Sequence, residues 1–100
     1  MATYVVLLTL TEAGRKAIGD PSGLDAAKRG VEAMGAQWKG WYLTMGRYDA
    51  VVIVEAPDDE TATKIGLVQA RAGTAIGETL RAFTEDEYRQ MAAALPPAPA

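Results

Sequence analysis

The stretch Met45–Asp59, MGRYDAVVIVEAPDD, decides the fold of this chain. It begins with a short polar turn at Gly46, continues as a run of aliphatic residues, and stops at Pro57 and two acids. A β-branched run of this length, bounded by turn residues, is typical of a β-strand. The preceding segment, residues 36–45 (AQWKGWYLTM), is rich in aromatic residues and also predicts a strand. The glycine-containing turn between the two strands therefore predicts a β-hairpin.

The segments on either side of this hairpin predict further strands and helices. Before it come a strand at 3–10 (TYVVLLTL), a helix at 12–18 capped by Thr11, a turn cluster at 19–23 and a second helix ending at Gly35. After it come a helix with Asp58, Asp59 and Glu60 at its start, a strand at 74–83, and a last helix opened by the capping box Thr84–Glu87. This order is the split-βαβ, ferredoxin-like pattern, an α+β fold with a four-stranded antiparallel sheet. We expect one domain at 1–95 and a disordered Pro/Ala tail at 96–100.

Composition limits the classes of function open to a chain of 100 residues. The net charge of −3 argues against a nucleic-acid partner and against anchoring on anionic lipid. The chain has no cysteine and no histidine, so the commonest metal ligands and the commonest general base are missing. We therefore expect no metal site and no cofactor. The start, MATYVVLLTLTEAG, lacks the basic residues of a signal peptide, and its apolar run is too short for a membrane span, so we expect a cytoplasmic protein without a membrane partner.

The hairpin sorts its side chains onto two faces, provided that its loop holds an even number of residues. One set is Trp41, Leu43, Met45, Ala50, Val52 and Val54, and the other is Trp38, Tyr42, Thr44, Asp49, Val51, Ile53 and Glu55. The first set is wholly apolar and is predicted to face the helices. The second set mixes aromatic and aliphatic residues with an acid, and a second subunit is expected to cover it, since monomers rarely expose so much apolar surface. An odd loop would swap the sets along one strand.

With these residues in view, the segment from Tyr4 to about Met91 resembles the GYD family of small bacterial and archaeal proteins. Gly46, Tyr48 and Asp49 of MGRYD carry the resemblance, together with VVIVEAPDDE (51–60), GWYLT (40–44) and TLRAFT (79–84). The resemblance implies a ferredoxin-like fold of the dimeric α/β-barrel type, in which two sheets face each other. It implies no established activity, because the family is named for its motif.

The turn residues have a structural and a functional interpretation. Structurally, Gly46 supplies a positive φ angle, Asp49 bonds backbone amides in the turn, and Tyr48 packs on the sheet edge and bonds through its hydroxyl. Functionally, Arg47, Tyr48 and Asp49 rim a ligand cavity, since binding residues often lie on loops held by a rigid scaffold.

The hairpin strands supply the remaining candidates. Glu55 is a catalytic base if burial between facing sheets raises its pKa, and otherwise a solvated residue at the strand end or a partner for Lys39 or Arg81. Tyr42 is a candidate proton donor, and with Trp38 it is also a candidate for stacking on a ligand. Glu78 and Arg81 fall on opposite faces of their strand, so we expect no pair between them.

Three functions stay open at this point. The first is a homo-oligomer that binds a small molecule, either between the helices and the open sheet face or between paired sheets. The second is a cofactor-free oxygenase or isomerase with Glu55 as base and Tyr42 or Tyr48 as proton donor or orienting group, an analogy that rests on the fold alone. The third is a structural assembly module, which predicts no interface cavity above roughly 300 Å³.

Overall fold

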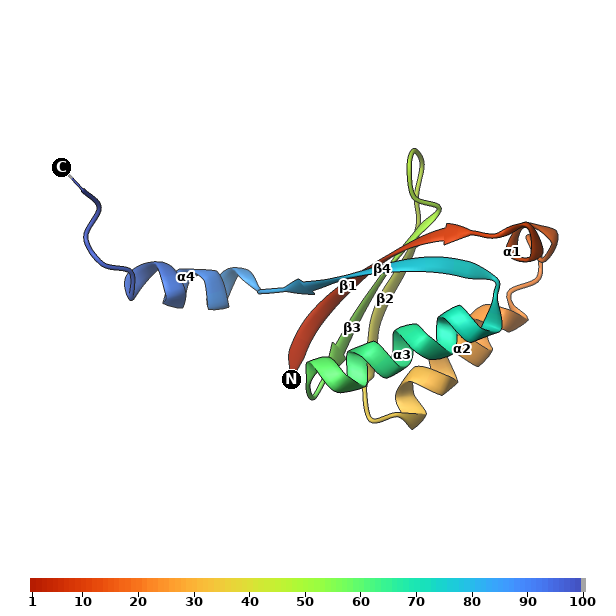
Figure 1. Ribbon diagram of the computed structural model, residues 1–100, viewed down its shortest axis with the longest axis horizontal. Coiled ribbons are helices and arrows are strands. Elements are labelled where there is room, and N and C mark those ends of the chain that lie inside the picture. Colours follow the sequence, from red (N-terminus) through yellow and green to blue (C-terminus); the bar gives the residue numbers. More distant parts are fainter. Residues whose placement is uncertain (100) are drawn as a thin grey trace.

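The computed structural model describes residues 1–99, whose strands and helices follow in the order β-α-α-β-β-α-β-α (Figure 1). The elements are β1 (Ala2–Leu10), α1 (Glu12–Lys16), α2 (Ser22–Ala33), β2 (Gln37–Leu43), β3 (Ala50–Ala56), α3 (Asp59–Ala72), β4 (Ala75–Ala82) and α4 (Glu85–Ala93). Each predicted element is present, with ends that shift by a few residues. The capping box of α4 is confirmed, since the Thr84 side chain accepts from the Glu87 amide and the Glu87 carboxylate accepts from the Thr84 amide.

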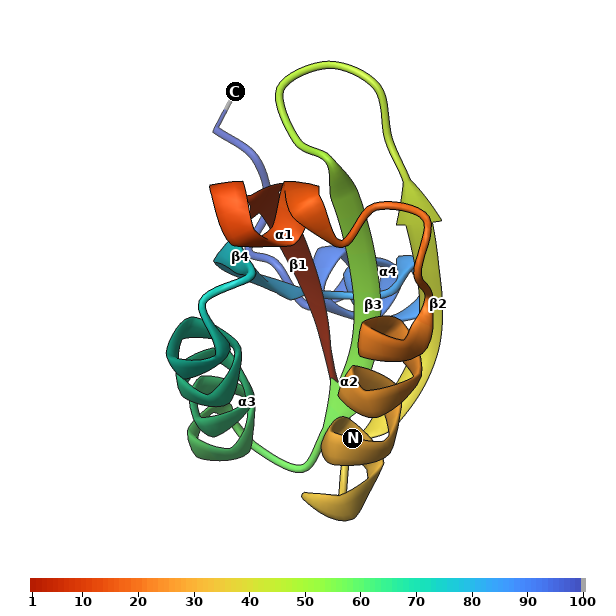
Figure 2. The same cartoon turned by 90° about the vertical axis from the view of Figure 1, so that its right-hand side faces the viewer.

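The four strands form one antiparallel sheet in the order β2-β3-β1-β4. Helices α2 and α3 lie over one face of this sheet, while α1 sits at the end of β1 and α4 extends away from the end of β4 (Figures 1 and 2). One of the two inner strands, β1, is apolar on both sides, so it contributes apolar residues to the face opposite the helices as well as to the core. The α+β, ferredoxin-like prediction is thus confirmed. Among residues 1–99, no helix has both the length and the apolar character that a membrane span requires.

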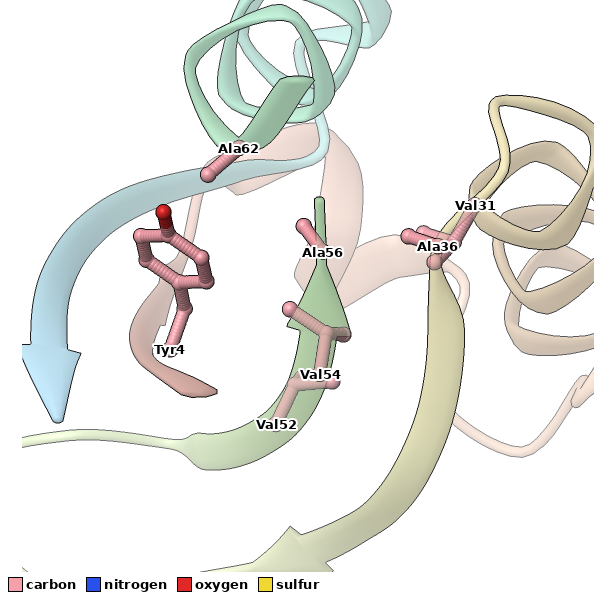
Figure 3. Packing of buried hydrophobic residues seen from close by; sticks show 7 residues of the cluster. All are labelled: Tyr4, Val31, Ala36, Val52, Val54, Ala56 and Ala62. Atoms are coloured by element: carbon pink, nitrogen blue, oxygen red, sulfur yellow. The ribbon is translucent and has the colours of Figure 1, made fainter. Parts of the chain in front are cut away.

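The core lies between the sheet and the two helices and is made mostly of small side chains (Figure 3). Its buried members are Tyr4, Val31, Ala36, Val52, Val54, Ala56 and Ala62. Tyr4 is the one large side chain in this cluster, and even it retains 3% of its surface exposed. Each buried valine contributes about 1.5–3 kcal/mol, so a core of valines and alanines gives one chain modest stability.

The register of the hairpin confirms most of the predicted faces and corrects two residues. Leu43 pairs with Ala50 across a six-residue loop, so Trp41 and Val52 share the helix face while Tyr42 and Val51 share the opposite face. A β-bulge at Lys39 adds one residue to β2, and Trp38 therefore pairs with Val54 on the helix face. The prediction that Trp38 lies on the same face of the sheet as Tyr42 was wrong for this reason. Met45 is also not on the helix face, because it lies in the loop and is 98% exposed.

The face opposite the helices, called the open face from here on, is largely apolar. It carries Thr3, Val5, Leu7, Thr9, Tyr42, Val51, Ile53, Glu55, Ile76, Glu78 and Leu80, as the strand pairing requires. Ile76 and Leu80 are exposed, and Val5, Leu7, Val51 and Ile53 are only half-buried. The opposite orientation of Glu78 and Arg81 is as predicted, since Glu78 pairs with Leu7 and Arg81 with Tyr4.

The chain exposes more surface than a monomer of its mass normally does. Its accessible surface is 7145 Å², whereas a monomeric protein of 10.6 kDa exposes about 5,500 Å². The radius of gyration of 16.0 Å likewise exceeds the value of about 13 Å for a compact chain of 100 residues. The extended α4 and the open face account for this shape. Residues Pro96–Pro99 form no helix or strand, and Ala100, the end of the tail predicted to be disordered, lies outside the described residues.

Candidate functional site: a cavity between two helices and the sheet

A cavity of about 620 Å³ lies between α2, α3 and the sheet. Its lining is mainly apolar and includes Val6, Leu8, Ala27, Gly30, Val31, Met34, Trp38, Trp41, Val52, Val54, Ile65 and Val68. Both tryptophans of the chain belong to this lining. The cavity is therefore formed within one chain, on the face of the sheet opposite the open face.

The sequence of α2 explains why the space stays unfilled. This helix directs small residues, Gly23, Ala26, Ala27 and Gly30, toward the cavity. A methyl group added at Gly30 meets no atom within 4 Å. Figure 2 shows α2 and α3 as two separate columns over the sheet, and the four small residues of α2 leave part of the space between them unfilled. The bulge at Lys39 completes the cavity by turning Trp38 toward it.

A second, more polar hollow of about 440 Å³ adjoins the cavity between α3 and β4. The two share Gly66, Gly77 and Thr79 in their linings, so the apolar cavity borders this more polar hollow, which is called its polar end. Tyr4, Asp59 and Arg81 line this end. A ligand that fills the cavity can thus place a polar group at this end.

Tyr4 and Asp59 form the shortest side-chain contact of the polar end. The Tyr4 hydroxyl donates to Asp59 Oδ1 at 2.5 Å. This hydrogen bond, followed by burial, raises the pKa of Tyr4 above its usual value. Tyr4 is therefore a neutral donor at pH 7 and not a base. The Arg81 guanidinium lies 5.6 Å from the centre of the Tyr4 ring and 4.3 Å from that of Phe83, and it donates to the Thr3 and Ala82 carbonyls.

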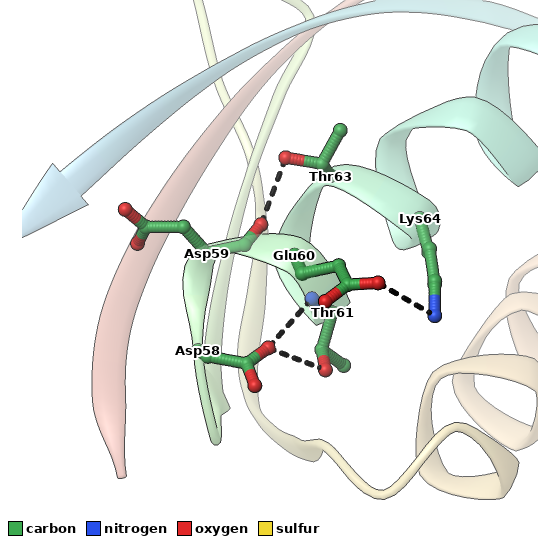
Figure 4. A network of polar contacts seen from close by, with 6 residues as sticks. All are labelled: Asp58, Asp59, Glu60, Thr61, Thr63 and Lys64. Atoms are coloured by element: carbon green, nitrogen blue, oxygen red, sulfur yellow. Dashed lines mark hydrogen bonds and ion pairs between the residues drawn. The ribbon is translucent and has the colours of Figure 1, made fainter.

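The acids at the start of α3 have separate structural partners (Figure 4). Asp58 accepts from the amide and the hydroxyl of Thr61, both at 2.8 Å, and these bonds lower the pKa of Asp58. Glu60 pairs with Lys64 at 3.3 Å, and the Asp59 carbonyl accepts from Thr63 at 2.8 Å. The prediction that a helix start explains these acids is confirmed. Across residues 1–99, no three carboxylates come together in a way that could hold a metal ion.

The hairpin residues form a cluster that fastens the loop to β1 and β4. Gly46 has a φ of +94°, which confirms the predicted positive angle. The Tyr48 hydroxyl donates to Glu78 Oε2 at 2.9 Å, which raises the pKa of Tyr48, and the Arg47 guanidinium lies 5.6 Å from the Tyr48 ring centre. Asp49 Oδ2 accepts from the Leu10 amide at 2.8 Å. This amide belongs to β1, whereas the prediction placed the amide partner of Asp49 in the turn.

The other two candidates lie on the open face, away from the cavity. Glu55 pairs with Lys39, Nζ to Oε2 3.7 Å, which is the structural alternative stated for it above. Tyr42 is 61% exposed, and its ring covers the position where Gly40 lacks a side chain. Of the predicted ligand-binding residues, the structure thus brings only Trp38 to the cavity.

Sequence reasoning missed Tyr4, Gly30, Thr79 and Arg81 as site residues. Tyr4 had a usable signal, since it is the one hydrogen-bonding side chain in the otherwise aliphatic set Tyr4, Val6, Leu8 and Leu10. Gly30 had a weaker signal. A glycine in the interior of a helix lowers the stability of the helix, so its presence indicates a packing or functional role.

An antiparallel four-stranded sheet in this order, with two helices on one face, defines a ferredoxin-like α+β protein. Within that class, the chain belongs to the GYD domain family, whose model matches residues 4–92. The resemblance noted from the sequence is thereby confirmed. A comparison with curated proteins finds no match. In this chain the Gly, Tyr and Asp of MGRYD close the hairpin and join it to the two neighbouring strands.

Proposed function

We propose that this protein is a homo-oligomer, at least a dimer, whose chains each bind an apolar small molecule in the cavity between α2, α3 and the sheet. The cavity carries the proposal. Its volume of about 620 Å³ falls within the range of about 300–1,000 Å³ that is usual for ligand sites. Its apolar lining and its few polar groups at one end also match the usual composition of such sites.

The lining indicates the kind of molecule that fits. Trp38 and Trp41 offer rings on which a flat apolar or aromatic group packs well. Thr79 and Arg81 at the polar end favour a single hydrogen-bonding or anionic group on the ligand. The ligand class is therefore a compact apolar molecule with one polar end.

The open face supports the second part of the proposal. The surface excess of the single chain, about 1,600 Å², exceeds the roughly 800 Å² per partner that a standard interface buries. Val5, Leu7 and Ile53 lie in the middle of this face and are only half-buried. A second copy packed on the face removes them from water.

No particular observation favours the enzyme alternative. Its base, Glu55, is paired with Lys39 on the open face, and Tyr42 lies on that same face. Tyr4 lines only the polar end of the cavity, and its hydroxyl is a hydrogen-bond donor at neutral pH. Binding without turnover requires no further group.

Filling the cavity tests the binding proposal. Because both tryptophans line the cavity, their emission reports binding of the fluorescent apolar anion 1-anilinonaphthalene-8-sulfonate by energy transfer. We expect Gly30→Phe to weaken this binding at least tenfold, since its ring occupies the space that the native residue leaves open. Native mass spectrometry of the protein from its own host reports the mass of any ligand that the chain retains.

Two control variants accompany this measurement. Gly30→Ala leaves most of the space, and Glu32→Phe adds the same ring at an exposed position of α2 that does not line the cavity, so both should bind the probe as the unmodified chain does. Equal probe affinity for Gly30→Phe and its controls, with all variants folded by circular dichroism, would overturn the cavity as the binding site.

A further inference from the structure

Helix α4 stands apart from the rest of the molecule. No residue of α4 is buried, and Figure 1 shows it extending beyond the end of β4. Its large apolar side chains are nevertheless on one side: Tyr88 and Met91 are three residues apart, and Leu95, two residues past the end of the helix, follows in the final turn, where its amide donates to the Ala92 carbonyl. These three, called the α4 stripe, are 64%, 44% and 68% exposed.

A helix of this length does not hold together by itself. α4 has nine residues, and isolated helices below about 12–15 residues are marginal in water. The capping box and the Glu85–Arg89 pair at 2.8 Å give local support, but each contributes only about 1 kcal/mol or less. The remaining stabilisation has to come from packing of the α4 stripe on another surface.

Within residues 1–99, the chain itself does not cover α4. Only Phe83 and Thr84 connect β4 to α4, and two extended residues span about 7 Å. Thr84 has the extended conformation (φ −67°, ψ 165°), so in the described structure α4 leads away from the end of β4 and does not turn back over the sheet as α3 does (Figure 1). The side chain of Thr84 is also fixed in the capping box, which holds the direction of departure.

A second copy of the chain is the occupant that the dimensions favour. The exposed surface exceeds that of a compact monomer by about 1,600 Å², about twice what one partner buries in a standard interface. The open face and α4 are also continuous, because β4 presents Ile76 and Leu80 on that face and leads into α4 after two residues. A two-fold dimer closes both surfaces at once, since each arm then meets the other copy.

We propose that α4 is an exchanged arm, which in the homodimer lays the α4 stripe on the partner subunit. This inference rests on the proposed dimer and adds a specific second contact to it. It also gives α4 a role that the binding cavity does not require.

The test compares two charge-matched variants of the full chain by sedimentation equilibrium and by hydrogen exchange of the α4 amides. Met91→Lys/Leu95→Lys places charges in the α4 stripe, and Gln90→Lys/Ala93→Lys places the same charges on the other side of the helix. We expect the stripe variant to raise the dimer dissociation constant at least tenfold and to lose protection of the α4 amides, while the sheet amides stay protected. The control variant should stay within twofold of the unmodified chain in both respects.

The possible failures separate the two proposals. A chain that stays monomeric at every concentration overturns the dimer and the arm together. A dimer whose dissociation constant and α4 exchange do not respond to Met91→Lys/Leu95→Lys overturns the arm alone. Protection of α4 that is the same in dilute monomer and in dimer also overturns the arm, because α4 then packs on its own chain. Unprotected α4 amides in a stable dimer have the same consequence.

Discussion

Gly14 is the residue at which a single methyl group has the largest predicted effect. An added Cβ at this position lies 2.0 Å from the Thr74 carbonyl oxygen, a backbone atom that cannot move aside cheaply. The α3–β4 connection at Gly73 and Thr74 is held in place by Thr11. The Thr11 amide donates to the Thr74 carbonyl oxygen, and the Thr11 hydroxyl donates to the Gly73 carbonyl. The close approach of α1 to the α3–β4 connection therefore depends on glycine.

We predict that Gly14→Ala lowers the free energy of unfolding by about 1–3 kcal/mol, as overpacking in a rigid site does. Gly23→Ala is the matched control, because Gly23 lies inside α2 and an added Cβ there meets nothing within 4 Å. The control should be neutral or more stable by up to about 1 kcal/mol, from helix propensity. Urea unfolding followed by circular dichroism measures both, and equal stability of the two variants would contradict the close approach.

Local turn chemistry could be predicted at single residues, whereas contacts between distant segments could not. Gly46 has the positive φ expected for the hairpin, because that requirement arises within a few residues. Gly14 approaches Thr74, sixty positions later, and nothing in the sequence near Gly14 indicates this contact. Asp49 shows both cases: an amide partner was expected, but the amide belongs to Leu10 in another strand.

At the scale of the elements, periodicity predicted the strands but not the irregularity within one of them. Alternation places Trp41 and Tyr42 on opposite faces, as observed. The bulge at Lys39 reverses the pattern beyond it and moves Trp38 to the helix face. Strand alternation assumes one residue per step, so an inserted residue remains invisible until the partner strand is known. The single residue inserted at Lys39 is therefore the reason that Trp38 lines the cavity.

The cap of α3 makes the stability of this element depend on pH. Hydrogen bonds from the Thr61 amide and hydroxyl lower the pKa of Asp58 in the folded chain. A carboxyl whose folded pKa is lowered contributes its stabilisation fully above the unfolded pKa, about 4, and loses it as the pH falls through the lower folded value. Asp20 and Glu87 act in the same direction, since the Ser22 and Thr84 amides lower their pKa values.

We predict that Asp58→Asn reduces the loss of stability between pH 6 and pH 2.5, because an asparagine cap does not titrate. The midpoint of urea unfolding should fall less in this variant than in the unmodified chain over that interval. Asp25→Asn is a suitable comparison, as Asp25 lies in the first turn of α2 and its side chain caps no helix. An unchanged pH dependence in Asp58→Asn would show that this cap is not a source of acid sensitivity.

On the scale of the whole molecule, the sequence predicted the order of the elements and the presence of an apolar open face. It left open whether a ligand pocket lies next to the helices or between paired sheets, and it did not show that the space between α2, α3 and the sheet stays unfilled. The space stays unfilled because small residues such as Ala27 and Gly30 line it, and the bulge in β2 adds Trp38 to its lining. Small residues in a helix are equally compatible with close packing, so the sequence pattern does not distinguish a filled space from a cavity.

The open face provides the last prediction. Ile53 lies near its middle, where it pairs with Val5 on β1 and with Gly40 on β2. We predict that Ile53→Lys raises the dimer dissociation constant at least tenfold, because a lysine buried between two apolar faces loses its hydration without gaining a partner. In a single chain the same position is only half-buried, so the variant should still fold.

Ile18→Lys is the matched control for this change, since Ile18 follows α1 and is 71% exposed. Sedimentation equilibrium should give the unmodified dissociation constant for this control. If α4 is an exchanged arm, Ile53→Lys also removes the protection of the α4 amides although the substitution lies in another element, because the arm loses the surface on which it packs. Undisturbed dimerisation of Ile53→Lys would place the interface elsewhere, and the excess surface of the open face would then require a different partner.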